Sequence, residues 1–504
     1  ALTLGRNEAR AFAVWVANQD EGTVSKLDSR TGREVARYPT VGSMAPAGAR
    51  PWNEFCNWSN TGNCPSRTAV DQNFDAYVAN RAFGNQGTVT KYANRESDCI
   101  DRNANGVIDT SRDLNDDGII EIGTEEFVGP DDECILWTVA VGANNGWPRA
   151  LAVGLAPPDR TVGDVWVGLF NHEQACRLDP TTGATIACID IAGFNPYGMA
   201  ADSAGRIWAV DRSNDGRRDV LGYVDAAAMT FHPVEGLPNP TGSTCAIPYG
   251  VTVDGSGDVF FANQCRPGVW RYRPSTHEWT PIEIVGPNSP RGVAADESSL
   301  WVAISHAGDQ YSGGLGNRVL RYNLADLSLV GEYTLPTGLG PVGIGVSFDG
   351  SVWAVCQGNN LAGRFDPTSG SWTEHPVGLT PYTYSDFIGF GLNVFAEPRG
   401  HYRFVVEGCA EGHNQWLGAR YAAEVPPETE VALFARTADT REGLASEPWV
   451  GPFTGNPARF TDPPGPLAPR RYLEVEIRLS TMDRRAAPRV FGIDVAGVCE
   501  PIID

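Results

Sequence analysis

The 504-residue chain lacks several features that define common classes of protein. No run approaches the roughly 20 apolar residues that a transmembrane helix needs, so we expect no helical membrane span. Basic residues are few, with 39 Lys and Arg against 61 Asp and Glu. The resulting net charge of −22 argues against non-specific binding to nucleic acid or to an anionic membrane surface. Helix-forming stretches are almost absent.

Common catalytic and metal-binding motifs are also missing. The sequence has no Gly-x-Ser-x-Gly elbow, no phosphate-binding Gly loop followed by Lys and Ser or Thr, and no metalloprotease helix. It has no Cys-x-x-Cys or His-x-x-x-His spacing for zinc. The first residues, ALTLGRNEARAF, do not have the character of a signal peptide, so we expect either no export or an already removed leader.

Two offset series of strand-like segments are present instead. One series opens on a proline and continues with apolar residues, at Pro65, Pro148, Pro196, Pro248, Pro290, Pro341 and Pro381. The other is centred on an aromatic residue, at Trp15, Tyr77, Trp166, Trp208, Phe260, Trp301 and Trp353. Repeats of about 40 to 50 residues are typical of β-propellers.

The two series predict a closed ring. Trp15 has no proline strand before it and Pro381 has no aromatic strand after it, so each supplies what the other lacks. Pairing them in one sheet removes the exposed strand edges of an open array, which is the alternative arrangement. We therefore predict an all-β chain, with a seven-bladed β-propeller over residues 1–395 and a β-sandwich over residues 396–504.

Ten of the eleven cysteines form local pairs in this arrangement. The predicted disulfides are Cys56 with Cys64, Cys99 with Cys134, Cys176 with Cys188, Cys245 with Cys265, and Cys409 with Cys499. Cys356 is left over, at the end of an inner strand. Five disulfides indicate an oxidising compartment; a reduced chain with coincidental spacing is the alternative.

An acidic insertion at residues 96–135, in the second blade, carries two copies of a calcium-loop pattern. Each copy has oxygen-bearing side chains at positions one, three, five and nine, glycine at six, and a backbone carbonyl available at seven. The candidate ligands are Asp101, Asn103, Asn105, Val107, Asp109, Asp113, Asn115, Asp117, Ile119, Glu121 and Glu125. A solvated acidic loop is the alternative to one or two structural Ca²⁺ ions.

The copies depart from an EF-hand at position twelve. Arg112 and Thr124 stand where an EF-hand has a bidentate Glu, and Asp113 and Glu125 follow one residue later. No flanking helices are evident. The loops resemble the acidic repeats of thrombospondin type 3 and dockerin modules, in which the next repeat can complete a site. That resemblance gives Asp113 the role of closing the first loop.

The residue after each leading proline is expected near the mouth of the central channel. These residues are Ser66, Arg149, Tyr197, Tyr249, Arg291, Val342 and Tyr382. Arginines and tyrosines around one opening suit an anionic or sugar-like ligand, so the predicted ligand face is Arg149, Tyr197, Tyr249, Arg291 and Tyr382. Alternatively, these side chains hold the blades together through neighbouring backbone and through Asp71, Asp211 and Asp386.

The repeated pattern Pro-x-Gly-Val-x-x-Asp-x-x-Gly-x-Val-Trp resembles the streptogramin B, or virginiamycin B, lyase family of seven-bladed propellers. The resemblance covers about residues 10–390. It implies an elimination that opens a cyclic depsipeptide, using magnesium, an acidic residue and histidines, one of them in a Pro-His-Gly motif. The positions here hold Tyr197, Tyr249, Arg291 and Val342, without histidine. An elimination needs a base to take the proton, and the histidine that supplies it in the family is missing at these positions.

Two enzymatic readings stay open as alternatives. For a lyase, only His172 and His306 follow inner aromatic strands and can approach the rim. For a lactonase with a metal in the channel, the candidate ligands are Asp71, Asn18, Asn80, Asp211 and Asn263, which are otherwise expected to cap strand ends.

The C-terminal region, from about residue 396, has alternating runs such as HYRFVVEG and RYLEVEIRLS, which indicate a separate sandwich. It resembles modules appended to bacterial secreted proteins, some of which bind carbohydrate. Trp416 and Trp449 suit either a sugar platform or the core.

These features predict a secreted or surface-displayed bacterial binding or scaffold protein, stabilised by calcium and disulfides and without catalytic activity. The expected partner is a protein or carbohydrate ligand, with no nucleic acid and no membrane span. Self-assembly and a periplasmic location stay open.

Overall fold

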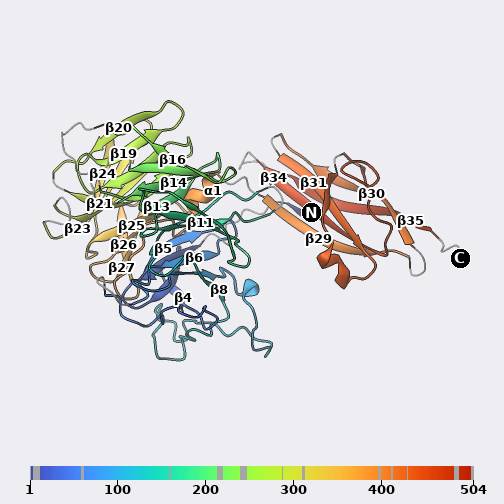
Figure 1. Cartoon of the computed structure of the whole chain (residues 1–504), viewed down its shortest axis with the longest axis horizontal. Coiled ribbons are helices and arrows are strands. Elements are labelled where there is room, and N and C mark those ends of the chain that lie inside the picture. Colours follow the sequence, from blue (N-terminus) through green and yellow to red (C-terminus); the bar gives the residue numbers. More distant parts are fainter. Residues whose placement is uncertain are drawn as a thin grey trace. The chain divides into compact units, whose positions relative to one another are not determined.

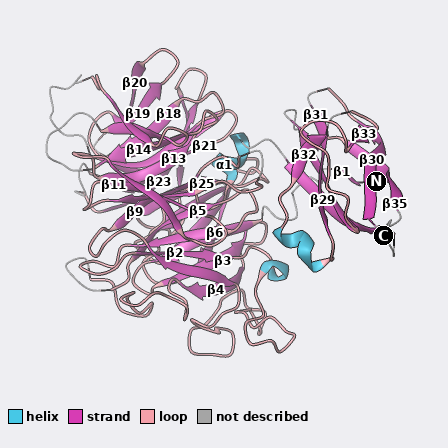
Figure 2. Cartoon of the chain, turned by 45° about the vertical axis from the view of Figure 1, so that its right-hand side comes forward, coloured by secondary structure: helices cyan, strands magenta, loops and turns pink. Residues whose placement is uncertain are grey.

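The computed structural model describes residues 2–3, 12–57, 62–157, 160–212, 220–238, 247–286, 288–308, 313–395, 399–409, 413–427, 429–453, 455–481 and 487–500. The chain divides into two compact units, one of Asn7–Ala396 and one of Ala1–Arg6 with Glu397–Asp504. Almost all regular structure in the described ranges is β-strand (Figure 2). No helix in those ranges is both long enough and apolar enough to cross a membrane.

The described part of Asn7–Ala396 contains seven antiparallel sheets, each built from strands that follow one another in the sequence (Figure 1). The first three sheets contain β2 (Ala13–Asn18), β3 (Thr23–Asp28) and β4 (Glu34–Pro39); β5 (Pro65–Val70), β6 (Ala76–Asn80), β7 (Thr88–Tyr92) and β8 (Ile135–Ala140); and β9 (Pro148–Val153), β10 (Val165–Leu169), β11 (Gln174–Leu178) and β12 (Thr185–Asp190).

Four further sheets follow in chain order. They contain β13 (Pro196–Ala201), β14 (Arg206–Asp211), β15 (Leu221–Asp225) and β16 (Thr230–Val234); β17 (Pro248–Val253), β18 (Val259–Asn263), β19 (Gly268–Arg273) and β20 (Glu278–Glu283); β21 (Ser289–Ala295), β22 (Ser299–His306), β23 (Leu315–Asn323) and β24 (Leu329–Thr334); and β25 (Pro341–Val346), β26 (Val352–Cys356), β27 (Leu361–Asp366) and β28 (Ser371–Pro376). A short helix, α1 (Phe390–Phe395), comes next.

Burial changes systematically across each sheet. The aromatic-centred strands β2, β6, β10, β18 and β26 are buried at every position. The last strands, such as β12 and β24, alternate between exposed and partly buried residues. This gradient explains the sequence pattern, because a strand covered on both faces needs a continuous apolar run and a strand at the outside does not.

The first strands of consecutive sheets pack side by side in the order β5, β9, β13, β17, β21, β25. The segment after Pro381 then pairs with β2, with an antiparallel bridge between Asn18 and Pro381. The Tyr382 amide donates to the Ala17 carbonyl at 2.8 Å, and the Trp15 amide donates to the Phe387 carbonyl at 2.9 Å. The expected pairing of the two ends is therefore present.

The same closing segment also contacts β5, the first strand of the next sheet. The Thr68 amide donates to Ser385 Oγ at 3.0 Å, and Thr68 Oγ1 donates to the Asp386 carbonyl at 3.0 Å. Residues 381–387 thus bridge the two ends of the series of inner strands, and the unit is a β-propeller.

The second unit contains two four-stranded sheets. One has the order β1 (Leu2–Thr3), β35 (Arg489–Glu500), β30 (His413–Glu424), β33 (Ala458–Arg459), and the other β29 (Arg399–Glu407), β34 (Tyr472–Thr481), β31 (Thr429–Ala438), β32 (Val450–Phe453). One apolar cluster takes residues from both sheets, including Trp416, Leu433, Ile477 and Val490. Trp416 therefore lies in the core, with 4% of its surface exposed.

The boundary of this unit differs from the one that the sequence suggests. The sequence pattern places residues 1–395 in the propeller, but Leu2 pairs with Val490 and Thr3 with Arg489, so β1 extends the β35 sheet. A two-residue strand carries no periodicity that the sequence pattern could reveal.

Four disulfides are described: Cys56–Cys64, Cys99–Cys134, Cys176–Cys188 and Cys409–Cys499. These four predicted pairs are confirmed, whereas Cys245 lies outside the described residues. Cys356 is a free, buried cysteine in β26. Burial, followed by the charge of Glu374, raises the pKa of the Cys356 thiol to about 12.

Candidate functional site

The first strand of each sheet from β5 to β25, which we call an inner strand, has a β-bulge directly after its leading proline. In β5, Pro65 pairs with Asn80 but Arg67 pairs with Ala79, so the strand register shifts directly after the proline. The same shift follows the leading proline of β9, β13, β17, β21 and β25. A bulge leaves a residue outside the ladder and redirects its side chain. The residue after each proline is thereby set apart from the regular alternation of the strand.

Glycines next to the bulges let the inner strands approach closely. A Cβ on Gly250 would lie 2.6 Å from the Arg291 carbonyl oxygen of the next inner strand. A Cβ on Gly343 would overlap the Thr383 carbonyl oxygen of the closing segment. The glycine of the Pro-x-Gly repeat is therefore required by backbone packing between neighbouring sheets.

The five residues of the predicted ligand face come together at this end of the inner strands. The Tyr197 and Tyr249 rings lie 4.9 Å apart, and the Tyr382 hydroxyl hydrogen-bonds with that of Tyr249 and lies 3.4 Å from that of Tyr197. The Arg149 guanidinium lies 4.7 Å from the centre of the Tyr197 ring, and that of Arg291 lies 5.1 Å from the centre of the Tyr249 ring.

This cluster is buried rather than arranged as an open rim. Tyr197, Tyr249 and Tyr382 are each at most 2% exposed, and Arg149 and Arg291 are 7% and 5% exposed. Any ligand group that reaches these side chains is largely removed from water, which strengthens its electrostatic interactions with them.

A second, surrounding set of side chains, missed by the sequence analysis, occupies equivalent positions at the same end of the inner strands, and most of its members contact the cluster. Each member comes directly after the last residue of a sheet's second strand, and that last residue pairs with the leading proline. The backbone amide of each member donates to the carbonyl of the residue before that proline. The set is Gln19, Arg81, Phe170, Arg212, Gln264 and Gln357. The signal that could have found them is their constant position directly after the aromatic-centred strand.

Arg67 and Tyr384 also belong to the cluster. The Arg67 guanidinium lies 3.0 Å from the centre of the Tyr384 ring and 5.0 Å from that of Tyr197, and it donates to the Tyr197 carbonyl. Tyr384 lies two residues after Tyr382 in the closing segment, so the closure of the ring brings it here. We refer to Arg67, Arg81, Arg149, Arg212, Arg291, Tyr197, Tyr249, Tyr382 and Tyr384 as the arginine–tyrosine cluster.

Electrostatics in the cluster favour negative charge. Burial lowers the pKa of Arg67 to about 9 and that of Arg81 to about 9, so both groups remain cationic at neutral pH. Burial alone would raise the pKa of Tyr197, but Arg149, Arg212 and Arg67 hold it well below its ordinary value.

Of the three carboxylates expected to brace this region, Asp71 and Asp386 make other contacts, whereas Asp211 accepts the Asn195 amide at 2.9 Å, next to Pro196. Asp71 accepts the Tyr77 hydroxyl at 2.8 Å and lies 3.6 Å from Lys91. Asp386 accepts the amides of Ile388 at 3.1 Å and Gly389 at 2.7 Å, so it supports the turn before α1. Burial raises the pKa of the Asp386 carboxyl.

The candidate lactonase ligands end strands and hold the adjoining loops. Asn18 Nδ2 donates to Thr23 Oγ1 and Ser25 Oγ within its own hairpin. Asn263 Oδ1 accepts the Ile247 amide at 2.7 Å. No group of three or more His, Cys, Asp or Glu side chains in the described ranges is arranged to hold a metal ion.

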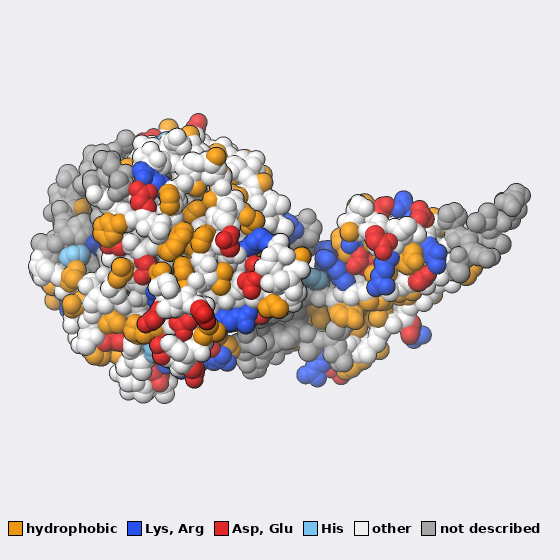
Figure 3. Space-filling view, turned by 90° about the horizontal axis from the view of Figure 1, so that it is seen from below, with side chains coloured by type: hydrophobic (Ala, Val, Ile, Leu, Met, Phe, Trp, Pro, Cys, Tyr) orange, Lys and Arg blue, Asp and Glu red, His pale blue; other side chains and the backbone are white. Residues whose placement is uncertain are grey.

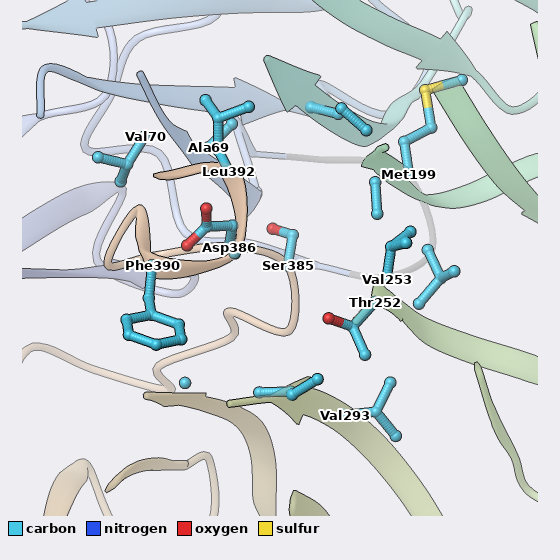
Figure 4. Close-up of a pocket in the computed structure, with 18 of the residues that line it drawn as sticks. Ala69, Val70, Met199, Thr252, Val253, Val293, Ser385, Asp386, Phe390 and Leu392 are labelled. Atoms are coloured by element: carbon cyan, nitrogen blue, oxygen red, sulfur yellow. The ribbon is translucent and has the colours of Figure 1, made fainter. Parts of the chain in front are cut away.

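A small apolar cavity lies at the other end of the inner strands (Figure 4). Its walls come from β5, β9, β13, β17, β21 and β25, from residues 385–386 and from α1, and include Met199, Val253, Val293, Phe390 and Leu392. Its volume of about 70 Å³ accommodates a few water molecules.

The insertion between β7 and β8 forms two loops with the same hydrogen bonds. Asp101 Oδ2 accepts the Gly106 amide at 2.8 Å, and Asp113 Oδ2 accepts the Gly118 amide at 2.8 Å. In the first loop, the Asn103 and Asn105 side chains both donate to Asp109 Oδ2, at 2.7 and 3.1 Å. The oxygen-bearing side chains of each predicted set thus turn inwards around a glycine.

Two glutamates complete these loops in equivalent ways. Glu133 accepts the amides at positions two, three and nine of the first loop, from Arg102, Asn103 and Asp109, at 2.7, 3.2 and 2.9 Å. Glu126 accepts the amides at the same three positions of the second loop, from Leu114, Asn115 and Glu121, at 3.1, 3.2 and 3.2 Å. Both carboxylates are buried, at 2% and 5% exposure.

The residues expected to close the loops make other contacts in this structure. Asp113, which the resemblance places at the end of the first loop, also stands at position one of the second, where Arg33 contacts it at 2.7 Å. Glu125 is exposed. The spacing rule counts along the chain, whereas Glu133 reaches the first loop because the Cys99–Cys134 disulfide returns the chain to its start.

The residues fit a calcium site of the loop type. Each loop combines carboxylates, an Asn at position three and a backbone carbonyl at position seven, from Val107 or Ile119, which are the hard oxygen ligands that Ca²⁺ prefers. Such sites take several ligands from Asn and from backbone, so they do not require three acidic side chains in mutual contact.

No family model and no curated protein matches the sequence. Among solved structures, the chain is similar to virginiamycin B lyase from Staphylococcus aureus, at 16% identity and a TM-score of 0.45, over 66% of this chain and 92% of that one. It is similar to a protein from Lactobacillus plantarum at 12% identity and a TM-score of 0.47, over 74% and 98% of the two chains. It is also similar to a gluconolactonase from Xanthomonas campestris at 18% identity and a TM-score of 0.33, over 44% and 74%.

Proposed function

We propose that the chain is an exported, calcium-stabilised binding protein without catalytic activity, built from a seven-bladed β-propeller and a C-terminal β-sandwich. The seven antiparallel sheets and the closing segment support the blade count. The core shared by the two C-terminal sheets supports the sandwich. The four disulfides support an oxidising location outside the cytoplasm, whether secreted, on the cell surface or in the periplasm.

The ligand face of this protein is the arginine–tyrosine cluster. The observation that carries the proposal is the convergence of Arg149, Tyr197, Tyr249, Arg291 and Tyr382, which come from five separate segments. A protein or a carbohydrate that presents one suitable group to the cluster is the expected partner.

Binding is tested by screening labelled protein, with calcium present, on glycan and peptide arrays. Arg149→Gln is the matched variant, because Arg149 is the most exposed of the five predicted side chains. We expect the wild-type protein to retain a ligand that the variant loses. Equal retention by both proteins, or no retention by either, would remove the ligand face from the proposal.

Calcium supports the insertion, which is polar and has little core of its own. We assign Asp101, Asn103, Asn105, Val107 and Asp109 with Glu133 to one ion. The second ion takes the corresponding set, which is Asp113, Asn115, Asp117, Ile119 and Glu121 with Glu126. Binding that requires the folded loops stabilises the fold by about 2.7 kcal/mol when free calcium is 100 times the dissociation constant.

Calorimetric titration of EDTA-treated protein tests the calcium sites. We expect up to two ions per chain, and the loss of one in Glu126→Gln and of one in Glu133→Gln. Glu125→Gln is the control, because that side chain is exposed. A full complement of calcium in both glutamate variants would refute the assignment of these closing ligands.

A second candidate function, a propeller lyase, rests on His306. Burial, followed by the charge of Arg291, lowers the pKa of His306 to about 4, so its imidazole is neutral at neutral pH, and its Nδ1 lies 3.1 Å from Ser305 Oγ. Incubation with a streptogramin B depsipeptide, comparing wild type with His306→Ala, tests this candidate. Ring opening by the wild type alone would support it, and no opening by the wild type would exclude it.

A further inference from the structure

Two guanidinium groups of the cluster are buried without an ion pair. In the described part of the chain, neither Arg67 nor Arg149 contacts a carboxylate within salt-bridge distance. Nε and Nη1 of Arg67 and Nε of Arg149 are buried and have no hydrogen-bond acceptor. Arg67 is fully buried, and Arg149 is 7% exposed. A buried charge without a partner destabilises a protein by several kcal/mol, so these groups need compensation.

Several arginines elsewhere in the propeller contact a carboxylate. Arg273 contacts Asp258 at 3.0 Å, and Arg364 contacts Asp349 at 3.0 Å. On the face shown in Figure 3, Lys and Arg side chains are scattered, and several lie beside Asp or Glu. Arg50, Arg271 and Arg471 each have a buried Nε without an acceptor as well, but each of them also contacts a carboxylate. Arg67 and Arg149 differ from these arginines in having no such ion pair in the described part of the chain.

The groups that most affect the pKa of Arg67 include no carboxylate. After burial, the groups that most affect its pKa are Tyr197, Tyr382 and Tyr249, which raise it, and Arg149, which lowers it. Tyrosine hydroxyls and aromatic faces attract a cation weakly compared with a carboxylate. The Gln264 side chain, from the surrounding set, is fully buried and has no partner at either its Nε2 or its Oε1.

We propose that the arginine–tyrosine cluster binds an oxyanion, a carboxylate, phosphate or sulfate group, whose oxygens accept from Arg67 and Arg149. This inference rests on the proposed binding function and names the chemistry of its ligand. A guanidinium presents several N–H donors in one plane and matches the oxygens of such a group. A neutral sugar would leave both buried charges unpaired. The tyrosine rings provide faces against which a ring attached to the anion can pack.

Thermal unfolding of the full, calcium-loaded chain tests the inference, with sulfate and phenyl sulfate as probes. Sulfate tests a free ion, and phenyl sulfate tests the same group carried on a ring. Sodium chloride at equal ionic strength is the reference, and glucose is the neutral probe. We expect either sulfate probe to raise the unfolding midpoint progressively with concentration, above the chloride reference. A response to sulfate indicates a free ion, and a response to phenyl sulfate alone indicates an anionic group on a larger ligand.

Three variants distinguish binding from bracing. Arg67→Met and Arg149→Met remove one guanidinium each, and both should lose the response to the sulfate probes. Without the probes, Arg67→Met should unfold at or above the wild-type temperature, because it removes an uncompensated buried charge. Arg273→Met, which breaks a compensated pair, should keep the full response. If Arg67→Met does not fold, Arg149→Met alone decides the loss of response.

Two results would overturn the inference. One is a wild-type midpoint that neither sulfate probe raises above the chloride reference. The other is an equal response in wild type and Arg149→Met. If glucose, but no sulfate probe, raises the midpoint and Arg149→Met abolishes that effect, the oxyanion inference fails while the proposed binding function stands.

Discussion

The closure of the propeller predicts a strong effect of one methyl group. In Gly343→Ala, the new Cβ would overlap the Thr383 carbonyl oxygen. Neither atom can rotate away, because Cβ is fixed directly to the backbone and the oxygen is part of it. The closing segment must then move away from β25. This movement weakens two hydrogen bonds. One runs from the Tyr382 amide to the Ala17 carbonyl, at 2.8 Å, and the other from the Ala17 amide to Thr383 Oγ1, at 2.9 Å.

The magnitude follows from these contacts. Overpacking a close-packed site costs roughly 1–3 kcal/mol, and each weakened hydrogen bond costs about 1 kcal/mol. We therefore expect Gly343→Ala to lower the free energy of unfolding by about 3 kcal/mol. Urea unfolding followed by tryptophan fluorescence measures this change, and hydrogen exchange of residues 13–18 shows whether it arises at the closure.

A matched control is available in the same unit. A Cβ on Gly391, in α1, would meet nothing within 4 Å, so Gly391→Ala should be neutral or stabilising by up to about 1 kcal/mol. If Gly343→Ala is as stable as Gly391→Ala, and exchange over residues 13–18 is unchanged, the close approach of β25 and the closing segment is not what holds the ring.

Further predictions concern other buried groups. Burial raises the pKa of Asp71 from 3.8 to about 7, so the folded state holds a proton that the unfolded state releases. Stability should therefore fall as pH rises from about 4 to about 7. A flatter dependence of stability on pH for Asp71→Asn would support this, and an unchanged dependence would contradict it. The thiol of Cys356, fully buried and with its pKa raised to about 12, should react with iodoacetamide only after denaturation, as mass spectrometry can show. Replacing the Cys99–Cys134 disulfide by two alanines frees 35 residues of chain and should destabilise the folded insertion by about 4 kcal/mol. Calcium titration of that variant should show weaker binding, and unaltered affinity would mean that the loops hold their shape without the disulfide.

The repeats could be read from the sequence because each is built by local rules. A fully buried strand requires a continuous apolar run, which each segment around an aromatic residue provides. The segments at Trp15 and Pro381 each lack a partner strand in their own repeat, and this predicts that they pair with each other. Disulfides followed from this framework, since Cys176 and Cys188 stand opposite each other in β11 and β12.

The remainder depended on contacts that the repeat pattern does not encode. Arg81 and Arg212 enter the cluster because each follows a strand whose last residue pairs with a leading proline, and this register appears only when the sheets are assembled. Glu133 closes the first loop from 32 positions beyond Asp101, so no spacing rule for a single loop includes it. The pairing of β1 with β35 joins segments from opposite ends of the chain.

The closing segment also has a consequence for the order of folding. The Ala17 amide donates to Thr383 Oγ1, 366 residues further along the chain. The sheet that contains β2 therefore cannot be completed until nearly the whole propeller has been synthesised. Contacts of such long sequence separation make folding slow. Until then β2 exposes an apolar strand with an unpaired edge, of the kind that promotes aggregation. The N-terminal sheet is therefore the part of the propeller that most needs protection before the chain is complete.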